Sequence, residues 1–268
     1  MLMTVQELAC GYNASRPILD HINFQLHERE ILAILGPNGV GKTTLFKTLL
    51  RLIPKLKGNI YIDGEDISKW SNRKAAQAIA YVAQNHVPPF PYLVQDVVIL
   101  GRVASTGYFK QPTKLDHEIA DEAMNDMGIY HLKEKPYTDI SGGERQLVML
   151  AQALAHQPKI LFLDEPTASL DYGNQSKVLE KIVSLSKRGY AVVMTTHSPE
   201  HAFMCRSKAL LLQKDSPVLF GTAEDILTEK NLHDAYNVKV NIVEYMGEDG
   251  KMMRMCSTSI NDSENDNG

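Results

Sequence analysis

The sequence predicts an α/β fold that combines a mostly parallel sheet with a β-rich N-terminal part and an inserted helical lobe. The apolar segments "KILFLD" and "AVVMTTH" are separated by the helical segment "NQSKVLEKIVSLSKRG", which is the βαβ order of a parallel sheet. From about residue 85 to residue 155 the pattern is helical instead. We therefore expect an α/β core into which a helical subdomain of about 85–155 is inserted.

The first 84 residues predict mainly strands. The segments "TVQELACGY" and "HINFQL" alternate apolar and polar residues as half-buried strands do, and "EILAIL" and "AYVAQ" fit short strands. The segment "GNIYIDG" ends in Asp63-Gly64, a hairpin turn signal. Between them, "KTTLFKTLLRLI" places apolar side chains at helical spacing as far as Ile53. This part is therefore expected to hold one helix among several strands.

The inserted lobe and the chain end have their own signals. In "DHEIADEAMNDMG", apolar residues from Ile119 to Met127 form one helical face, and Gly128 suits the position after the helix. After the strand "ALLLQ", residues 238–256 predict a β hairpin around "GEDG". Residues 257–268 are polar and acidic, which is typical of disorder. We expect a single domain over 1–256.

Composition excludes some classes of function. The 268 residues carry 28 basic and 32 acidic side chains, for a net charge of −4, so we expect no nucleic acid partner. Cys10, Cys205 and Cys256 form no C-x-x-C pair, which is typical of reduced cytoplasmic thiols. No basic and apolar leader stands at Met1 to Leu8, and no apolar run approaches the ~18 residues of a membrane span. We expect a chain that does not itself insert in a membrane.

The strongest chemical signal is "GPNGVGKTT", from Gly36 to Thr44, between an apolar strand and an amphipathic helix. It fits G-x-x-x-x-G-K-[ST], in which backbone N–H groups surround phosphates and the lysine neutralises the β and γ phosphate charge. Lys42 is therefore expected to bind phosphate and Thr43 to coordinate Mg²⁺. A plain glycine turn feeding a helix is the alternative, and the strand-turn-helix context disfavours it.

A metal ligand and a water activator are expected in "ILFLDEPTASLD". Asp164 ends the apolar strand, where its carboxylate can hold Mg²⁺ through a water molecule. Glu165 follows directly and can polarise the attacking water. The alternative, two acidic residues that merely begin a loop, loses weight because the phosphate-binding motif is present in the same chain.

The stretch "ISGGERQLVMLAQAL" has two interpretations. Ser141-x-x-Glu144 is a capping box, and the segment after it has an apolar side, so a plain helix start explains it. However, Gly142 and Gly143 each weaken a helix start by about 1 kcal/mol relative to alanine, with no evident structural reason. Close approach of a ligand to the backbone would explain both glycines. Because the first motif already encloses one nucleotide, we expect that ligand to be a nucleotide held by another chain.

At this point "GPNGVGKTT", "ISGGERQ", "ILFLDEPTASLD" and "MTTH" resemble, in order and spacing, the ATP-binding subunits of ABC transporters. The resemblance covers nearly the whole chain. It implies a P-loop NTPase (RecA-like) core with an N-terminal antiparallel β subdomain and the inserted helical subdomain. It also implies an ATPase that uses ATP and Mg²⁺ and acts as a homodimer, in which ATP closes the two chains and hydrolysis releases them.

The resemblance implies roles for individual residues. Tyr12 matches the aromatic that stacks on adenine, Gln84 the glutamine at Mg²⁺ and water, and His197 the histidine at the γ-phosphate. The remaining matches are the ATP-binding residues Gly36, Pro37, Asn38, Gly39, Gly41, Lys42, Thr43 and Thr44, the metal ligand Asp164, the catalytic Glu165, the signature residues Ser141, Gly142, Gly143 and Glu144, and the dimer-interface loop of Ser169, Leu170 and Asp171. Two positions depart from the commonest form of the family: Glu144 replaces glutamine and Ile140 replaces leucine.

Some of these residues also allow plainer interpretations. Tyr12 alone fits a tyrosine at a strand end, and Gln84 alone fits a polar turn residue. His197 and His201 have the i, i+4 spacing of a metal pair, but no third ligand is near in sequence.

The segment "NHVPPFPYLVQDVVILGRVASTGYF" resembles the importer branch for iron-siderophore, haem, cobalamin and molybdate. The resemblance implies a separate integral-membrane permease, an extracytoplasmic substrate-binding protein, and a peripheral position at the cytoplasmic face of the cell membrane. Phe90, Tyr92 and Arg102 are expected at the permease-docking surface, with a stiff surface loop as the alternative. A soluble ABC ATPase in cytoplasmic assembly, such as iron–sulfur cluster biogenesis, is the alternative function.

Overall fold

The computed structural model of the chain describes residues 1–13, 15–84, 90–103, 111–214, 216–247, 250 and 252–258. The expected α/β fold with a helical insertion is confirmed. The central sheet has the strand order β10-β9-β3-β8-β7-β6, and its five strands from β9 to β6 run parallel. These strands are β3 (Ile31–Leu35), β6 (Ile79–Val82), β7 (Ile160–Leu163), β8 (Ala191–Thr195), β9 (Lys208–Leu211) and the antiparallel β10 (Leu219–Thr222). Their carboxyl ends therefore meet at one edge of the sheet.

A second, antiparallel sheet has the order β2-β1-β4-β5. Its strands are β1 (Met3–Cys10), β2 (Leu19–Leu26), β4 (Lys57–Ile62) and β5 (Glu65–Asp66). Helix α1 (Lys42–Leu49) shares one hydrophobic cluster with this sheet and with one face of the parallel sheet, because Leu45, Phe46 and Leu49 are fully buried. The helix was expected to continue to Ile53, but it ends at Leu49 and the chain turns through Arg51, which has a φ of 61°.

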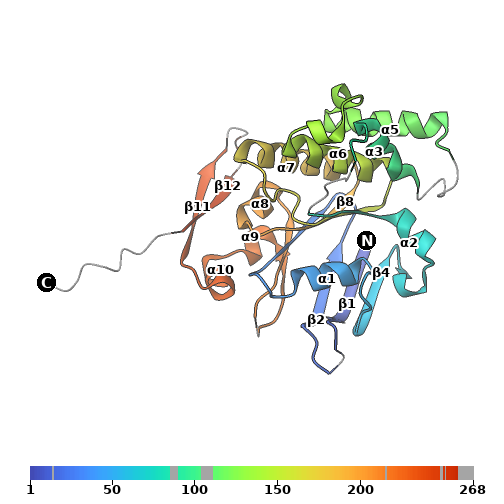
Figure 1. Cartoon of the computed structure of the whole chain (residues 1–268). Coiled ribbons are helices and arrows are strands. Elements are labelled where there is room, and N and C mark those ends of the chain that lie inside the picture. Colours follow the sequence, from blue (N-terminus) through green and yellow to red (C-terminus); the bar gives the residue numbers. More distant parts are fainter. Residues whose placement is uncertain are drawn as a thin grey trace.

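The helical insertion is built from α3 (Val94–Ile99), α5 (Lys114–Met127) and α6 (Gly142–Ala155). In Figure 1 these three helices gather at the top of the view, and the antiparallel strands β1, β2 and β4 lie below. Helix α5 begins with a capping box at Thr113 and ends at Gly128, whose left-handed φ of 75° is easily reached only without a side chain. The short 3₁₀ helices of the chain are η1 (Ile67–Lys69), η2 (Leu100–Arg102), η3 (Tyr130–Leu132) and η4 (Tyr137–Asp139).

The other helices complete the core. They are α2 (Asn72–Ala78), α7 (Tyr172–Lys187), α8 (Pro199–Met204), α9 (Ala223–Ile226) and α10 (Glu229–Tyr236). One large apolar cluster joins the second face of the parallel sheet to α5, α6, α7 and α8. The helical insertion and the parallel sheet are therefore packed through shared buried side chains, and a displacement of one is felt by the other.

An antiparallel hairpin of β11 (Val240–Met246) and β12 (Met252–Thr258) follows α10, and Figure 1 shows it at the left, in orange-red, beside α8 and α10. Strand β12 includes Ser257 and Thr258, two residues beyond the expected end of the hairpin at 256. The rest of the segment expected to be disordered, 259–268, lies outside the described residues. Within the described residues, no helix combines the length and apolar character needed to cross a bilayer.

Candidate functional site

The phosphate-binding motif forms a loop between β3 and α1 whose backbone requires glycine. Gly36, Gly39 and Gly41 have φ values of 147°, 78° and 113°, which side-chain-bearing residues rarely adopt. At Gly41, which caps α1, a Cβ atom would lie only 2.8 Å from Ile18 Cγ2. The loop therefore needs glycine for its positive φ angles and, at Gly41, for close packing against Ile18. The N–H groups of the loop lie at the start of a helix, where anions are favoured.

Lys42 turns back into this loop. Its Nζ donates to the carbonyl oxygens of Gly36 at 2.6 Å and Pro37 at 3.0 Å, and its side chain is buried. Burial lowers the pKa of Lys42, while the nearby carboxylates of Glu165 and Asp164 act in the opposite direction. The amine is thus held among oxygen atoms, in a position where phosphate oxygens can replace the two carbonyls.

A cavity of ≈ 200 Å³ opens at this loop. It brings together most of the expected nucleotide residues with two residues from distant strand ends, and its lining is Ile18, Asn38, Gly39, Gly41, Lys42, Thr43, Thr44, Glu165 and His197. Tyr12 lies in the same β1–β2 connection as Ile18 and is 73% exposed, so its ring is free to meet a flat ligand at the rim. Ser141, Gly142 and Gly143 do not line this cavity.

The two acidic residues after β7 are held by one hydroxyl. Thr195 Oγ1 donates to Asp164 Oδ1 at 2.7 Å and accepts the N–H of Glu165 at 2.8 Å. Glu165 has a φ of 47°, an uncommon conformation for a residue with a side chain, and Thr195 helps to hold it. Thr195 was not predicted from the sequence, where its one signal is a hydroxyl side chain at the end of an otherwise apolar strand.

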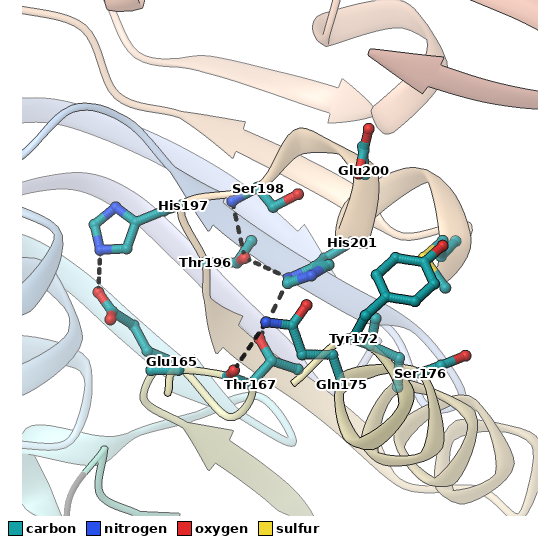
Figure 2. A pocket seen from close by; sticks show the side chains of 13 residues that line it. Glu165, Thr167, Tyr172, Gln175, Ser176, Thr196, His197, Ser198, Glu200 and His201 are labelled. Atoms are coloured by element: carbon teal, nitrogen blue, oxygen red, sulfur yellow. Dashed lines mark hydrogen bonds and ion pairs between the residues drawn. The ribbon is translucent and has the colours of Figure 1, made fainter. Parts of the chain in front are cut away.

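The Glu165 carboxylate is contacted by two other expected site residues. Gln84 Nε2 donates to its Oε2 at 2.6 Å, and His197 Nε2 contacts its Oε1. Figure 2 shows His197 and Glu165 pointing toward one another from two loops. A carboxylate in this position, at the mouth of the phosphate-loop cavity, can accept a proton from a water molecule near a bound phosphate.

Ser141 caps helix α6, as one of the two interpretations expected. Its Oγ accepts the Glu144 N–H at 3.3 Å, and its own N–H donates to Glu144 Oε2 at 2.7 Å. These hydrogen bonds, first that from the Ser141 backbone, lower the pKa of Glu144. Because glutamate and glutamine both close a capping box, the departure at Glu144 preserves the helix start.

The two signature glycines differ, and one expectation is corrected. A Cβ atom on Gly143 would lie 2.6 Å from Asn174 Cγ, so Gly143 has a structural reason within the chain. On Gly142 a Cβ atom would meet only Leu170 Cδ2, at an ordinary 3.8 Å. Packing within the chain therefore explains the glycine at Gly143, contrary to the expectation, and does not explain the glycine at Gly142.

The loop expected at a dimer interface lies against the start of α6. Asp171 caps α7 by accepting the Asn174 N–H at 2.8 Å, and Asn174 Nδ2 also donates to Asp171 Oδ2 at 2.7 Å. Ser169 is exposed with a φ of 61°, and Leu170 is half-buried. Asn174 thus ties this loop to Gly143, so the two segments form one surface.

The residues expected at a docking surface divide into two groups. Phe90 and Tyr92 are 59% and 49% exposed, with ring centroids 6.0 Å apart in an edge-to-face pair. Arg102 is buried: its Nε donates to Asp116 Oδ1 at 2.9 Å and its guanidinium also donates to the Ala155 carbonyl at 2.8 Å. The assignment of Arg102 to the docking surface is therefore corrected, because its charge is used inside the helical subdomain. The prolines of the same loop, at 88 and 89, lie outside the described residues.

His201 belongs to a hydrogen-bonded network. Its Nδ1 lies 2.9 Å from Thr196 Oγ1 and 3.3 Å from Thr167 Oγ1, and burial lowers its pKa. Figure 2 shows this network in a second cavity of ≈ 290 Å³, which lies between α7 and α8 and shares Glu165 and His197 with the first. Over the described part of the chain, no three side chains of the metal-binding types cluster as a metal site. Because Thr167 follows Glu165 and Thr196 precedes His197, the two hydrogen bonds of His201 connect the loops that carry these two site residues.

The amino-acid sequence is similar to those of known ATP-binding proteins, as a nucleotide site at this loop would require. Residues 19–168 match the family described as ABC transporter. The chain is 41% identical over 243 residues to an ABC transporter ATP-binding protein of Haemophilus influenzae, covering 91% of this chain and 92% of that protein. It is 36% identical over 231 residues to the molybdate import ATP-binding protein MolC of the same species, covering 86% of each.

A solved structure gives the same answer for the fold. An inward-facing ABC transporter described as of the metal-chelate type matches with a TM-score of 0.85 and 31% identity, covering 97% of this chain and 98% of that chain. This match confirms the expected P-loop NTPase architecture.

Proposed function

Because the chain belongs to the ABC transporter family as its ATP-binding cassette, and is therefore an ATPase, we propose that it drives a membrane importer. The cargo class proposed is a metal chelate, or a related cofactor or oxyanion such as molybdate. Two similarities support this class: the molybdate import protein MolC and the metal-chelate type transporter, which matches along almost the whole of both chains. No relative described above supports the alternative in iron–sulfur assembly.

The observation that carries the hydrolytic role is the position of Glu165. It faces the phosphate-loop cavity, with Gln84 on one carboxylate oxygen and His197 on the other. We assign Glu165 as the general base that orients and deprotonates the attacking water, and His197 as the contact to the γ-phosphate. Lys42 and the loop N–H groups neutralise the β and γ phosphates, and Tyr12 stacks on the adenine.

The residues at this site suit magnesium. Thr43 supplies a hydroxyl, Asp164 a carboxylate and Gln84 an amide, and hard oxygen ligands of this kind are those that Mg²⁺ prefers. We propose that these three side chains hold the ion, partly through water. A magnesium ion bound there supplies positive charge against the phosphates. Thr195 keeps Asp164 in place for this role through the 2.7 Å hydrogen bond.

We propose that two copies of the chain act as a homodimer with two-fold symmetry. The phosphate-loop cavity is not lined by Ser141 or Gly142, although Gly142 lies at a helix start where anions are favoured and packing gives no reason for a glycine. A nucleotide held by a second chain would explain why a glycine stands at Gly142 although the phosphate-loop cavity of its own chain lies elsewhere. Each ATP then lies between Lys42 of one chain and Ser141 of the other, and ATP binding becomes a switch of subunit distance.

The exposed ring pair of Phe90 and Tyr92 is the proposed contact to the permease. The two side chains follow Gln84 in the chain, and Gln84 binds the catalytic carboxylate, so a movement at the site has a short covalent path to this surface. Aromatic rings of this exposure on one patch are typical of protein–protein contacts. The chain would then sit at the cytoplasmic face of the membrane without crossing it, and an extracytoplasmic binding protein would deliver the cargo to the permease.

The importer assignment is tested by purifying the tagged chain from detergent-solubilised membranes of its source and identifying its partners by mass spectrometry. We expect a protein with many membrane spans. The matched comparison is Phe90→Asp against Leu115→Asp, since Leu115 is also exposed, at 61%, but lies on α5. Phe90→Asp should lose the partner while keeping ATP binding, and Leu115→Asp should keep both. Recovery of soluble partners alone would contradict the importer.

A further inference from the structure

The phosphate loop is contacted by a residue far outside its own motif. Gly36, the first residue of the loop, donates its N–H to the Tyr236 hydroxyl at 3.0 Å, across 200 positions of sequence. Tyr236 is the last residue of α10 and lies beyond the segment 19–168 that matches the family. The C-terminal part of the chain thus reaches the start of the ATP site.

The Gly36 N–H needs such a partner because it leaves the sheet at a buried position. The ladder hydrogen bonds around it use the carbonyls of Ile34 and Leu35, which accept from Thr196 and Leu212. Gly36 itself is buried, and a buried N–H without a partner destabilises the folded chain. The tyrosine hydroxyl satisfies this group where the sheet no longer does.

The same glycine connects directly to Lys42. Its carbonyl accepts from Lys42 Nζ at 2.6 Å, while its N–H is held by Tyr236. The backbone here has little freedom to move, since a Cβ atom on Gly36 would lie 2.6 Å from the Leu212 carbonyl oxygen and 2.9 Å from Val40 Cγ1. The position of Gly36 therefore fixes where the lysine amine is held.

Tyr236 is itself anchored. Its ring packs against the large apolar cluster, and the residue after it, Asn237, caps the helix in a left-handed conformation and donates its N–H to the His233 carbonyl at 2.7 Å. The β11 strand is tied to the start of the same helix, where Glu229 Oε1 accepts the Ile242 N–H at 2.8 Å. Burial raises the pKa of Tyr236 to about 12, so the hydroxyl stays neutral at all ordinary pH values.

We propose that Tyr236 is a positioning residue for ATP: its hydroxyl, delivered by α10, holds the Gly36 backbone from which the phosphate loop and Lys42 are oriented. The proposal rests on the phosphate loop as the ATP site and is independent of the importer assignment. Without the hydroxyl, the loop loses one of its fixed points, and ATP must restore the arrangement when it binds. ATP at saturation then still orders the loop.

The test is Tyr236→Phe, which removes one hydroxyl and keeps the ring. The KM for ATP should rise about fivefold, with kcat within about twofold of the unmodified chain, because the effect lies in ordering the loop before binding. The matched control is Tyr190→Phe. Tyr190 is another half-buried tyrosine, but it directly precedes β8, at the amino ends of the parallel strands, whereas the phosphate loop follows the carboxyl end of β3. This control should leave the KM unchanged.

Two results would overturn the proposal: an unchanged KM in Tyr236→Phe, even with a lowered melting temperature, or an equal rise in Tyr190→Phe. A second measurement needs no variant. In the unmodified chain without nucleotide, the Gly36 amide should exchange its hydrogen more slowly than the amide of Gly39, which is exposed at the loop tip. Equal exchange rates would also overturn the proposal. Absence of ATP binding in the unmodified chain would instead contradict the assignment of the site.

Discussion

At the scale of single residues, the site depends on side chains that hold others in place. Thr195 binds the carboxylate of Asp164 and the backbone of Glu165 with one hydroxyl, and Glu165 keeps an uncommon backbone conformation beside it. Such strain persists only where the surrounding structure holds it. The proposed base, Glu165, and the proposed metal ligand, Asp164, are therefore aligned by a residue that need not touch ATP.

Replacing Thr195 by valine keeps the shape of the side chain and removes both hydrogen bonds. We expect kcat for ATP hydrolysis to fall about tenfold, because the carboxylate of Asp164 and the N–H of Glu165 lose their partner. The measurement is steady-state phosphate release over a range of ATP concentrations. Ser186→Ala is the control, because it also removes a hydroxyl that donates a hydrogen bond. The acceptor of Ser186 is the Arg29 backbone carbonyl, which lies away from the site. A kcat that is equal in both variants would refute the alignment by Thr195.

At the scale of elements, the start of α6 and the loop before α7 form one surface. Asn174 joins them, since it hydrogen-bonds Asp171 and occupies the space beside Gly143. Gly142 lies on the same helix turn but is not crowded. Substitutions at the two neighbouring glycines can therefore distinguish an effect on folding of the single chain, at Gly143, from an effect on the proposed binding between chains, at Gly142.

Gly142→Ala and Gly143→Ala should have different effects. At Gly142 alanine fits, and because alanine favours a helix by about 1 kcal/mol over glycine, the free energy of unfolding should be equal or higher. ATP-dependent dimerisation should nevertheless weaken more than tenfold, since the added methyl group blocks approach to the nucleotide of the facing chain. At Gly143 the methyl group meets Asn174, so the single chain itself should be destabilised. Chemical denaturation and sedimentation with ATP measure the two effects, and normal dimerisation of Gly142→Ala would contradict the role of Gly142.

The helical subdomain holds a buried ion pair between Arg102 and Asp116. Asp116 accepts hydrogen bonds from Thr113 and from Arg102, and these partners, Thr113 first, lower the pKa of Asp116 to about 2. A carboxyl whose pKa is lowered by folding adds stability above its ordinary pKa, and this contribution is lost as the pH falls toward the folded value. Asp116→Asn should lower the free energy of unfolding at pH 7 by about 3–5 kcal/mol, because it removes the negative charge that lies against the buried guanidinium of Arg102.

The deficit of Asp116→Asn should shrink as the pH falls from about 4 to about 2, since the native carboxyl is then neutralised as well. Urea unfolding at several pH values measures this. The control is Glu122→Gln at an exposed position of the same helix, which should change stability little at any pH. A deficit of the same size at pH 3 and pH 7 would contradict the ion pair as its source.

At the scale of the whole molecule, the sequence predicted what local patterns determine. Strands β3, β7 and β8 were predictable because they are buried on both faces and, apart from Thr195, apolar throughout. The phosphate loop was predictable because its glycines and lysine lie within nine consecutive positions. Contacts between distant segments were not predictable: the burial of Arg102 depends on Asp116 and Ala155, and Gly143 depends on Asn174. The contact of Gly36 with Tyr236 spans 200 positions and leaves no pattern in either segment.

The central claim of a switch that operates between two chains is tested most directly by the mass in solution of Glu165→Gln with Mg²⁺ and ATP. This change removes the proposed general base, and a general base is worth ~10²–10⁴ in rate, but it keeps the groups proposed to bind ATP. We expect a stable dimer, with twice the 30.0 kDa mass of one chain, that returns to the single mass when ATP is removed. A chain that binds ATP and keeps the mass of one copy, or that hydrolyses ATP at the unmodified rate, would contradict it.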